Sequence, residues 1–457
     1  MSPLMSRLRG EGLFARVMRS SAWTALGYGA SQALRLASNL ILTRLLFPEA
    51  FGMMALVSVF LVGLTMFSDV GTGPSILQHR RGDEPDFLNT AWTIQVVRGV
   101  VLFLATCAMA YPVSVFYGQP DLAMLLPVAG ISLLIHGLDP TRIESATRHL
   151  RVGLVTALDL GSQVIGIVSM VVMAWLLQSV WALVFGWIVA SLARLALMTL
   201  YLPGEANRVR WERDAARDLI HFGFWLFLST ACGFLVAQGD KAILGKYLTL
   251  EHLGLYNIGF FLAAFPLMLG QTVTGRILIP LYRESPPAAS AENFLKIRKM
   301  RFALTGSILF MLAIMAFAGE TLIDLMYDAR YSSAGAILVV IAVIQIPQVI
   351  GMTYDQSALA AGDSRNYFLL TAARATFLVV GMIVGAEHMG LLGALIGQGI
   401  AAIAVYPFLV WLAWRHGAWD GLHDLVFAVV GVILAILALS VDETAIRALT
   451  SVFGGGA

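Results

Sequence analysis

The chain has 457 residues, of which 58% are hydrophobic and 13% are charged, and its mean hydropathy is +0.80. Soluble domains carry about 25% charged residues, so this composition excludes an ordinary soluble enzyme. The formal net charge of +2 is uninformative by itself. We expect no nucleic acid as a partner. The two cysteines, Cys107 and Cys232, both lie in apolar runs. They form neither a disulfide framework nor a metal-ligand pattern, so we expect no metal and no cofactor.

Apolar runs of membrane-spanning length recur from end to end and predict an all-α polytopic membrane protein. Lipid offers the backbone no hydrogen-bond partners, so the runs should be helices, and the alternation typical of a membrane barrel is absent. We count thirteen spans and expect twelve to fourteen. In chain order they are 21–45, 50–70, 88–112, 120–138, 152–177, 180–202, 219–247, 253–275, 299–319, 333–357, 365–386, 390–413 and 421–440.

The distribution of Lys and Arg predicts that the N-terminus is cytoplasmic. With that orientation, the cytoplasmic segments and their flanks hold about twenty of the thirty Lys and Arg residues, and the opposite loops hold about three. An odd number of spans leaves the C-terminus outside. The longest loop has roughly twenty residues (276–298), too few for a catalytic domain, so the helices themselves must carry the function.

A repeat indicates two parallel halves. The stretch "LTRLLFPEAFG" (42–52) aligns with "LGKYLTLEHLG" (244–254) at an offset of 202 residues. Six spans separate the copies, so both have the same orientation, as in many transporters; chance similarity of two turns is the alternative. The expected domains are an N-terminal arm (1–20), a six-helix bundle (21–202), a cytoplasmic linker (203–218), a second six-helix bundle (219–413) and an additional C-terminal helix with its tail (414–457).

Charged residues within the spans mark candidate functional positions, because such charges usually face the bundle interior or a wet cavity. Several lie on polar stripes with helical spacing. The stripes are Thr24, Tyr28, Ser31, Gln32, Arg35, Ser38 and Asn39 in the first span, Trp92, Gln95 and Arg98 in the third, Thr156, Asp159 and Gln163 in the fifth, Trp187, Ser191 and Arg194 in the sixth, and Gln345, Gln348 and Asp355 in the tenth, beside Pro347, which should kink its helix.

The deep charges predict a central cationic cavity between the two bundles. Five are basic and two acidic, and the planar fork of arginine suits phosphate oxygens. The alternative is that they form charge pairs within the packing, above all Asp240 with Lys241. The candidate substrate-binding residues are Arg35, Arg98, Lys241, Arg194 and Arg374; the candidate coupling or charge-pair residues are Asp159 and Asp240; the candidate helix-end or gating residues are Asp69 and Asp355.

Four stretches resemble the polysaccharide-transporter branch of the multidrug/oligosaccharidyl-lipid/polysaccharide exporter superfamily: "LILTRLLFPEAFGMMALV", "FSDVGTGPSILQHR", "LNTAWTIQVVRG" and "DKAILGKYLTLEHLGLYNIG". The resemblance covers about residues 15–415 and rests on the order of these pieces. It implies a transporter rather than an enzyme. This would be an inner-membrane flippase that carries an oligosaccharide on undecaprenyl diphosphate to the periplasmic leaflet by alternating access, for O-antigen, capsule or exopolysaccharide synthesis. It also implies other polysaccharide-assembly membrane proteins as partners. The unmatched thirteenth span departs from the family pattern.

Three other functions remain open at this point. A cation-coupled drug exporter of the same superfamily would need acidic cation sites, whereas the deep charges here are mostly basic. An integral-membrane glycosyltransferase or polysaccharide polymerase would need a sizeable outer loop with acidic residues, and none is present. A passive lipid scramblase fits the sequence as well.

The charge distribution gives a testable topology. We expect residues 71–87, 139–151 and 203–218 to be cytoplasmic, so Arg80→Cys and Arg210→Cys should resist a membrane-impermeant thiol reagent in intact cells. Labelling of either position without permeabilisation would show that the orientation is wrong.

Overall fold

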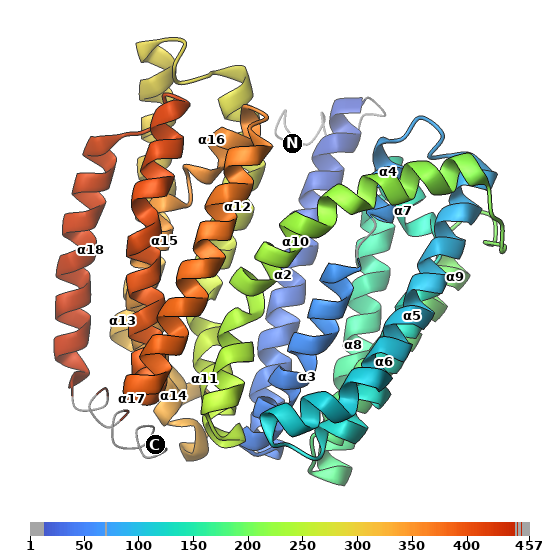
Figure 1. Ribbon diagram of the computed structural model, residues 1–457, viewed down its shortest axis with the longest axis horizontal. Coiled ribbons are helices and arrows are strands. Elements are labelled where there is room, and N and C mark those ends of the chain that lie inside the picture. Colours follow the sequence, from blue (N-terminus) through green and yellow to red (C-terminus); the bar gives the residue numbers. More distant parts are fainter. Residues whose placement is uncertain (1–12, 69–70, 444–445, 447–448, 450–457) are drawn as a thin grey trace, which may run out of the picture. The chain divides into compact units, whose positions relative to one another are not determined.

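Figure 1 shows a computed structural model in which the described part of the chain is built of helices, without a strand among the described residues. The structure describes residues 13–68, 71–443, 446 and 449; the side chains of 13–22, 25, 218, 220–229 and 276 are not described. In chain order the helices are α2 (Leu13–Leu45), α3 (Pro48–Phe67), α4 (Thr72–Gln78), α5 (Pro85–Tyr117), α6 (Leu122–Gly137), α7 (Arg142–Arg148), α8 (Val152–Leu177), α9 (Trp181–Tyr201), α10 (Arg213–Tyr247), α11 (Leu250–Ala263), α12 (Phe265–Glu284), α13 (Ala291–Met326), the short 3-10 helix η1 (Ala329–Tyr331), α14 (Ser333–Ile344), α15 (Ile346–Gly351), α16 (Asp355–Ala360), α17 (Ser364–Arg415) and α18 (Gly421–Val441).

The helices confirm an all-helical membrane fold. By length and composition, eight of the described helical segments can cross a membrane, with α14 to α16 counted as one segment, or up to ten if two bent pairs each count as one span. The bent pairs are α6 with α7, at 55°, and α11 with α12, at 45°. The expected span 152–177 coincides with α8, and the thirteenth expected span, 421–440, is α18.

Two breaks lie where the sequence predicts them. α14 ends at Ile344 and α15 begins at Ile346, so the tenth span is interrupted immediately before Pro347, which lacks the N–H that a continuous helix needs. α17 contains non-helical residues at Met389 and Gly390, where the expected span 365–386 is followed by the expected span that begins at residue 390. Gly390 has a φ of 58°, a left-handed conformation that glycine adopts at little cost.

The chain divides into two compact units. The first contains residues up to Leu46 and then Val57–Ala231; the second contains Phe47–Leu56 and everything from Cys232 on. α3 and α10 therefore each contribute to both units. The domain boundaries expected at 202 and 219 remain predictions.

Small residues allow close helix packing inside each unit, as is common in membrane helices. In the first unit, a Cβ built on Gly99 of α5 would lie 2.9 Å from the Cα of Gly137 on α6. In the second unit, a Cβ on Gly259 of α11 would lie 2.9 Å from the carbonyl oxygen of Ala334 on α14. Neither crossing has room for a side chain.

The repeated stretches meet within the second unit. A Cβ built on Gly52 of α3 would lie 2.0 Å from the carbonyl oxygen of Leu250 on α11, and a Cβ on Gly254 of α11 would lie 1.9 Å from the carbonyl oxygen of Pro48 on α3. Gly52 matches Gly254, and Pro48 matches Leu250, at the 202-residue offset. The two contacts are therefore reciprocal, as a local twofold relation between equivalent helix starts requires.

The close contact between α3 and α11 predicts how much stability is lost when either glycine is replaced. Gly52→Ala and Gly254→Ala should each destabilise the protein by about 1–3 kcal/mol, because backbone atoms must separate to admit the new methyl group. The double variant should cost less than the sum, since one separation relieves both clashes. Thermal unfolding in detergent measures this. Gly275→Ala on α12 is the matched control, since nothing lies within 4 Å of its Cβ position and it should leave stability unchanged or higher. If the three substitutions change thermal stability equally, the close contact between α3 and α11 does not limit these positions.

Candidate functional site

The polar stripes of the first and fifth spans face each other in the first unit. The side-chain amide of Gln163 on α8 donates to the carbonyl oxygen of Ser31 on α2, at 3.2 Å. A Cβ on Gly27 of α2 would overlap Thr156 of α8, at 2.1 Å. The polar faces that the sequence predicts on these two helices therefore lie against one another. Arg35 is on α2 and its side chain is exposed.

A cluster of charged and polar side chains lies beside this contact; we call it the Arg194 cluster, and it contains His136, Asp139, Asp159, Ser191 and Arg194. The guanidinium of Arg194 on α9 donates from Nε to Asp159 Oδ1 on α8, at 2.9 Å, and from an Nη atom to Asp139 Oδ2. His136 Nδ1 lies 3.3 Å from Asp139 Oδ2, and its Nε2 lies 3.3 Å from Ser191 Oγ. Arg194 thus forms ion pairs with two carboxylates at once.

Two members of this cluster, His136 and Asp139, were not singled out from the sequence. Both lie in "HGLDP" at the end of the fourth span, where Asp139 was assigned to a cytoplasmic loop. The structure buries Asp139, and Gln95 of α5 donates to the carbonyl oxygens of His136 and Asp139, at 3.0 and 3.4 Å. No local signal marks Asp139 as buried, because a carboxylate just beyond a span end fits a solvated loop equally well.

Arg98 of α5 is positioned by the end of α3. Its Nε donates to Ser68 Oγ at 2.9 Å, and an Nη atom donates to the carbonyl oxygen of Thr65 at 2.7 Å. Thr65 is in the last turn of α3, where a positive charge is favourable because the helix dipole leaves its C-terminal carbonyls negative. Arg98 therefore has a structural contact in addition to any contact with substrate. Asp69, the adjacent candidate, lies outside the described residues.

In the second unit, Arg374 of α17 pairs with Asp355 at the start of α16. Its two Nη atoms donate to the two carboxylate oxygens at 2.9 and 2.7 Å, the bidentate geometry that arginine forms with planar anions. Asp240 of α10 is buried and accepts a hydrogen bond from the Tyr256 hydroxyl at 2.6 Å. The Nζ of Lys241 lies 5.3 Å from the centre of the Phe260 ring.

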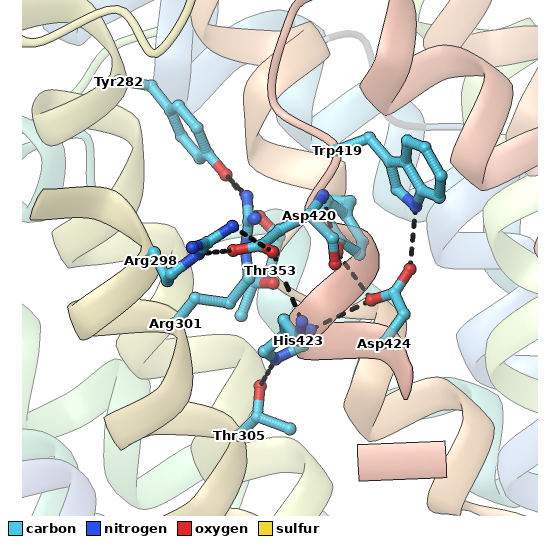
Figure 2. A network of polar contacts seen from close by, with 10 residues as sticks. Tyr282, Arg298, Arg301, Thr305, Thr353, Trp419, Asp420, His423 and Asp424 are labelled. Atoms are coloured by element: carbon cyan, nitrogen blue, oxygen red, sulfur yellow. Dashed lines mark hydrogen bonds and ion pairs between the residues drawn. The ribbon is translucent and has the colours of Figure 1, made fainter. Parts of the chain in front are cut away.

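A larger polar network, which the sequence did not indicate, attaches the start of α18 to α12 and α13 (Figure 2). Arg298 holds Asp420 with two hydrogen bonds, at 2.6 and 2.9 Å. Arg301 is 1% exposed, donates to the Tyr282 hydroxyl at 2.7 Å and lies over the Tyr354 ring at 4.3 Å. Further contacts, drawn as dashed lines in Figure 2, join His423 to Thr305 and Asp424, and Trp419 to Asp424. The Tyr354 hydroxyl also donates to Asp424 Oδ1, at 2.6 Å.

Asp420 forms an ion pair with Arg298 and also caps the N-terminus of α18. Its carboxylate accepts the backbone N–H of His423 at 3.3 Å, which caps the first turn of α18. Burial would raise the pKa of Asp420, but the hydrogen bonds from Arg298 and from the His423 N–H outweigh it, so the pKa lies below its usual value. Asp420 is therefore charged at neutral pH, and α18 is attached by an ion pair as well as by apolar packing.

The arrangement offers positive charge within membrane helices, but most of it is balanced. Arg194 and Arg374 have carboxylate partners, and Arg98 has oxygen partners on α3. Within the described residues, no group of three or more His, Cys, Asp or Glu side chains could hold a metal ion.

A family model and curated relatives connect this chain to proteins of polysaccharide biosynthesis. A family model described as "Polysaccharide biosynthesis protein" matches residues 41–336. The lipopolysaccharide biosynthesis protein WzxC of Escherichia coli K12 is 19% identical over 393 residues, which cover 84% of this chain and 77% of that protein. An uncharacterized membrane protein in the cps region of Klebsiella pneumoniae is 22% identical over 270 residues, or 58% of this chain and 55% of the relative. The chain thus spans little more than half the length of that relative.

Two solved structures are similar over most of the chain. One is an inward-facing multidrug resistance transporter of the MATE family in the MOP superfamily, with a TM-score of 0.66 and 14% identity, covering 85% of this chain and 95% of that one. The other is the lipid II flippase MurJ in an inward closed conformation, with a TM-score of 0.64 and 12% identity, covering 91% and 98%. At these identities the likeness establishes the fold alone.

The Arg374–Asp355 pair generates a double-mutant prediction. Arg374→Ala should destabilise the protein by about 3 kcal/mol, because it leaves a largely buried carboxylate without its partner. Adding Asp355→Asn should restore much of the loss, since a neutral amide needs no counter-charge. Thermal unfolding and membrane abundance measure both. If Asp355→Asn fails to rescue Arg374→Ala, the loss of stability does not come from an unpaired Asp355 carboxylate.

Proposed function

Because the chain belongs to the family of polysaccharide biosynthesis proteins, we propose that it is a flippase for an oligosaccharide linked to undecaprenyl diphosphate. It moves this substrate from the cytoplasmic to the periplasmic leaflet of the bacterial inner membrane, with its own N-terminus in the cytoplasm. The observation that carries the proposal is the family match over 41–336 in an all-helical membrane chain. The MurJ-like fold supports it, since MurJ is a lipid II flippase by name.

The physical problem of this reaction is the headgroup. A diphosphate and its sugars must cross the hydrocarbon layer while the polyprenyl tail stays in lipid. An anion crosses at acceptable cost only if positive charge accompanies it. Arginine suits this role because its rigid fork binds phosphate oxygens in pairs and remains charged.

Arg35 and Arg98 are the primary headgroup candidates. Arg35 lies ten residues before the end of α2, about 15 Å along the helix at 1.5 Å per residue, and Arg98 lies about 20 Å from the start of α5. Both positions fall well inside helices of spanning length. Their support is depth, charge type and the polar stripes on which they lie, and they remain predictions.

Arg194, Arg374 and Lys241 are secondary candidates in this proposal. Arg194 and Arg374 are held by carboxylates, so a phosphate would have to displace Asp139, Asp159 or Asp355 to reach them. Such exchange would link headgroup binding to rearrangement of helices, which alternating access requires. Asp159 and Asp240 keep their proposed role as coupling or charge-pair residues, and Asp69 and Asp355 theirs at helix ends or gates.

A cation-coupled exporter is the second candidate, and one observation favours it. In the Arg194 cluster two carboxylates face one guanidinium, so the described charges there leave an acidic excess.

A deletion strain of the host distinguishes the flippase from the exporter. Loss of the flippase should cause lipid-linked oligosaccharide to accumulate and surface polysaccharide to disappear, whereas loss of an exporter should raise sensitivity to cationic drugs and leave the glycan intact.

Substitution of the two primary arginines tests the site. In a deletion strain, Arg35→Ala should restore very little surface polysaccharide, and Arg35→Lys part of it, because lysine keeps the charge and loses the fork. Losing a charged hydrogen bond costs roughly 1.5–3 kcal/mol, about ten- to hundredfold in affinity. Surface polysaccharide is measured against protein abundance on a blot, with Arg217→Ala, an exposed arginine at the start of α10, as the matched control.

Arg98 needs a further control, because it also contacts the end of α3. Ser68→Ala removes the hydrogen bond to Arg98 Nε and leaves the charge in place. If Arg98 acts on the substrate, Arg98→Ala should abolish transport and Ser68→Ala should retain it. Equal defects in both variants would assign Arg98 to the packing of α3, and full transport by Arg35→Ala and Arg98→Ala at normal abundance would end the headgroup proposal.

A further inference from the structure

The connection between α9 and α10, residues 203–212, is tied along its length to the first unit; we call it the strap. Alternate backbone N–H groups donate to side chains of α5: Arg208 to Asn89 Oδ1 at 2.9 Å, Arg210 to Thr93 Oγ1 at 3.0 Å and Glu212 to Thr90 Oγ1 at 3.1 Å. Bonding at every second residue is the pattern of an extended chain. The strap is therefore a fixed element rather than a loose linker.

Ion pairs and a second set of hydrogen bonds hold the strap at both ends. Near α10, Glu212 accepts two hydrogen bonds from Arg81, at 2.8 and 2.9 Å. Near α9, Asn207 exchanges hydrogen bonds with Thr141, at 3.1 and 2.7 Å. These contacts involve side chains from two separate connections of the first unit.

Side chains on the strap divide between two faces. In an extended chain, successive side chains point to opposite sides. Val209 and Trp211 thus share one face, opposite Arg208, Arg210 and Glu212. Val209 is 79% exposed and Trp211 is 59% exposed. The strap presents an apolar surface that the described part of the chain leaves uncovered, and its two arginines balance its two glutamates.

The depth of the strap indicates what covers that surface. Its partners, Asn89 to Thr93, are in the first turns of α5, and the expected span begins at residue 88. α5 has 33 residues, about 50 Å of helix, against about 30 Å of hydrocarbon, so its first turns reach the membrane surface. At the other end, Leu200 and Tyr201 close α9 and are 75% and 64% exposed. The strap thus lies at the level where spans leave the lipid.

We propose that the strap is an interfacial membrane anchor, with Val209 and Trp211 inserted between the headgroups of the surrounding bilayer. Tryptophan favours this layer because its ring is apolar and its N–H can still reach water. The partner is the lipid surface itself, without a preference for anionic lipid, because the charges of the strap balance. Its role is to hold the first residue of α10, Arg213, at a fixed depth.

Spin-label accessibility tests the anchor. Single cysteines are placed by Val209→Cys, Trp211→Cys and Arg208→Cys in a Cys107→Ser/Cys232→Ser background, labelled with a nitroxide and reconstituted in phosphatidylcholine liposomes. Collisions with oxygen, which concentrates in lipid, should dominate at 209 and 211. Collisions with a water-soluble nickel chelate should dominate at 208, the matched position on the opposite face.

Two results would overturn the proposal. Nickel-dominated collisions at both 209 and 211 would place the apolar face in water, as expected if a separate protein normally covers it. The second measurement needs no label: the fluorescence of Trp211, taken as the difference between the protein and its Trp211→Phe variant, should be quenched by brominated lipid, whatever the other tryptophans contribute. A difference that brominated lipid does not quench would exclude contact of Trp211 with lipid even if the cysteine variants do not fold.

Discussion

The cost of charge in a low-dielectric layer decides where most polar side chains of this protein lie. A guanidinium or carboxylate on a membrane helix persists when an opposite charge or a hydrogen-bond partner is within reach. Arg194 has two carboxylate partners, and Arg374 has one that it binds in bidentate geometry. The helices that carry these groups are joined at specific registers, because an ion pair fixes both position and rotation where apolar packing alone would allow sliding.

The helical layout follows from local pattern and was therefore accessible from the sequence. Apolar length located α8, Pro347 located the break after α14, and helical spacing identified the polar face that joins α2 to α8. Each of these depends on residues within a few turns of each other. The same spacing found Arg194 and Asp159 on their separate helices.

Long-range partners were not accessible in that way. Arg301 lies in "KIRKMRF", where a run of positive charge is typical of a cytoplasmic flank, and nothing nearby shows that it is buried beside Tyr282 and Tyr354. Asp139 was assigned to a loop because it follows the end of a span. In both cases the residue type and local sequence fit a solvated position, and only the packing of a distant helix makes the position buried.

The reciprocal contact of Gly52 and Gly254 limits how either position can change. Two equivalent residues that each meet the equivalent carbonyl of the other helix form a self-complementary contact, which is the geometry of an isologous interface. Because two independently mutable positions make this contact, a substitution at one is tolerated only as far as the unchanged partner allows.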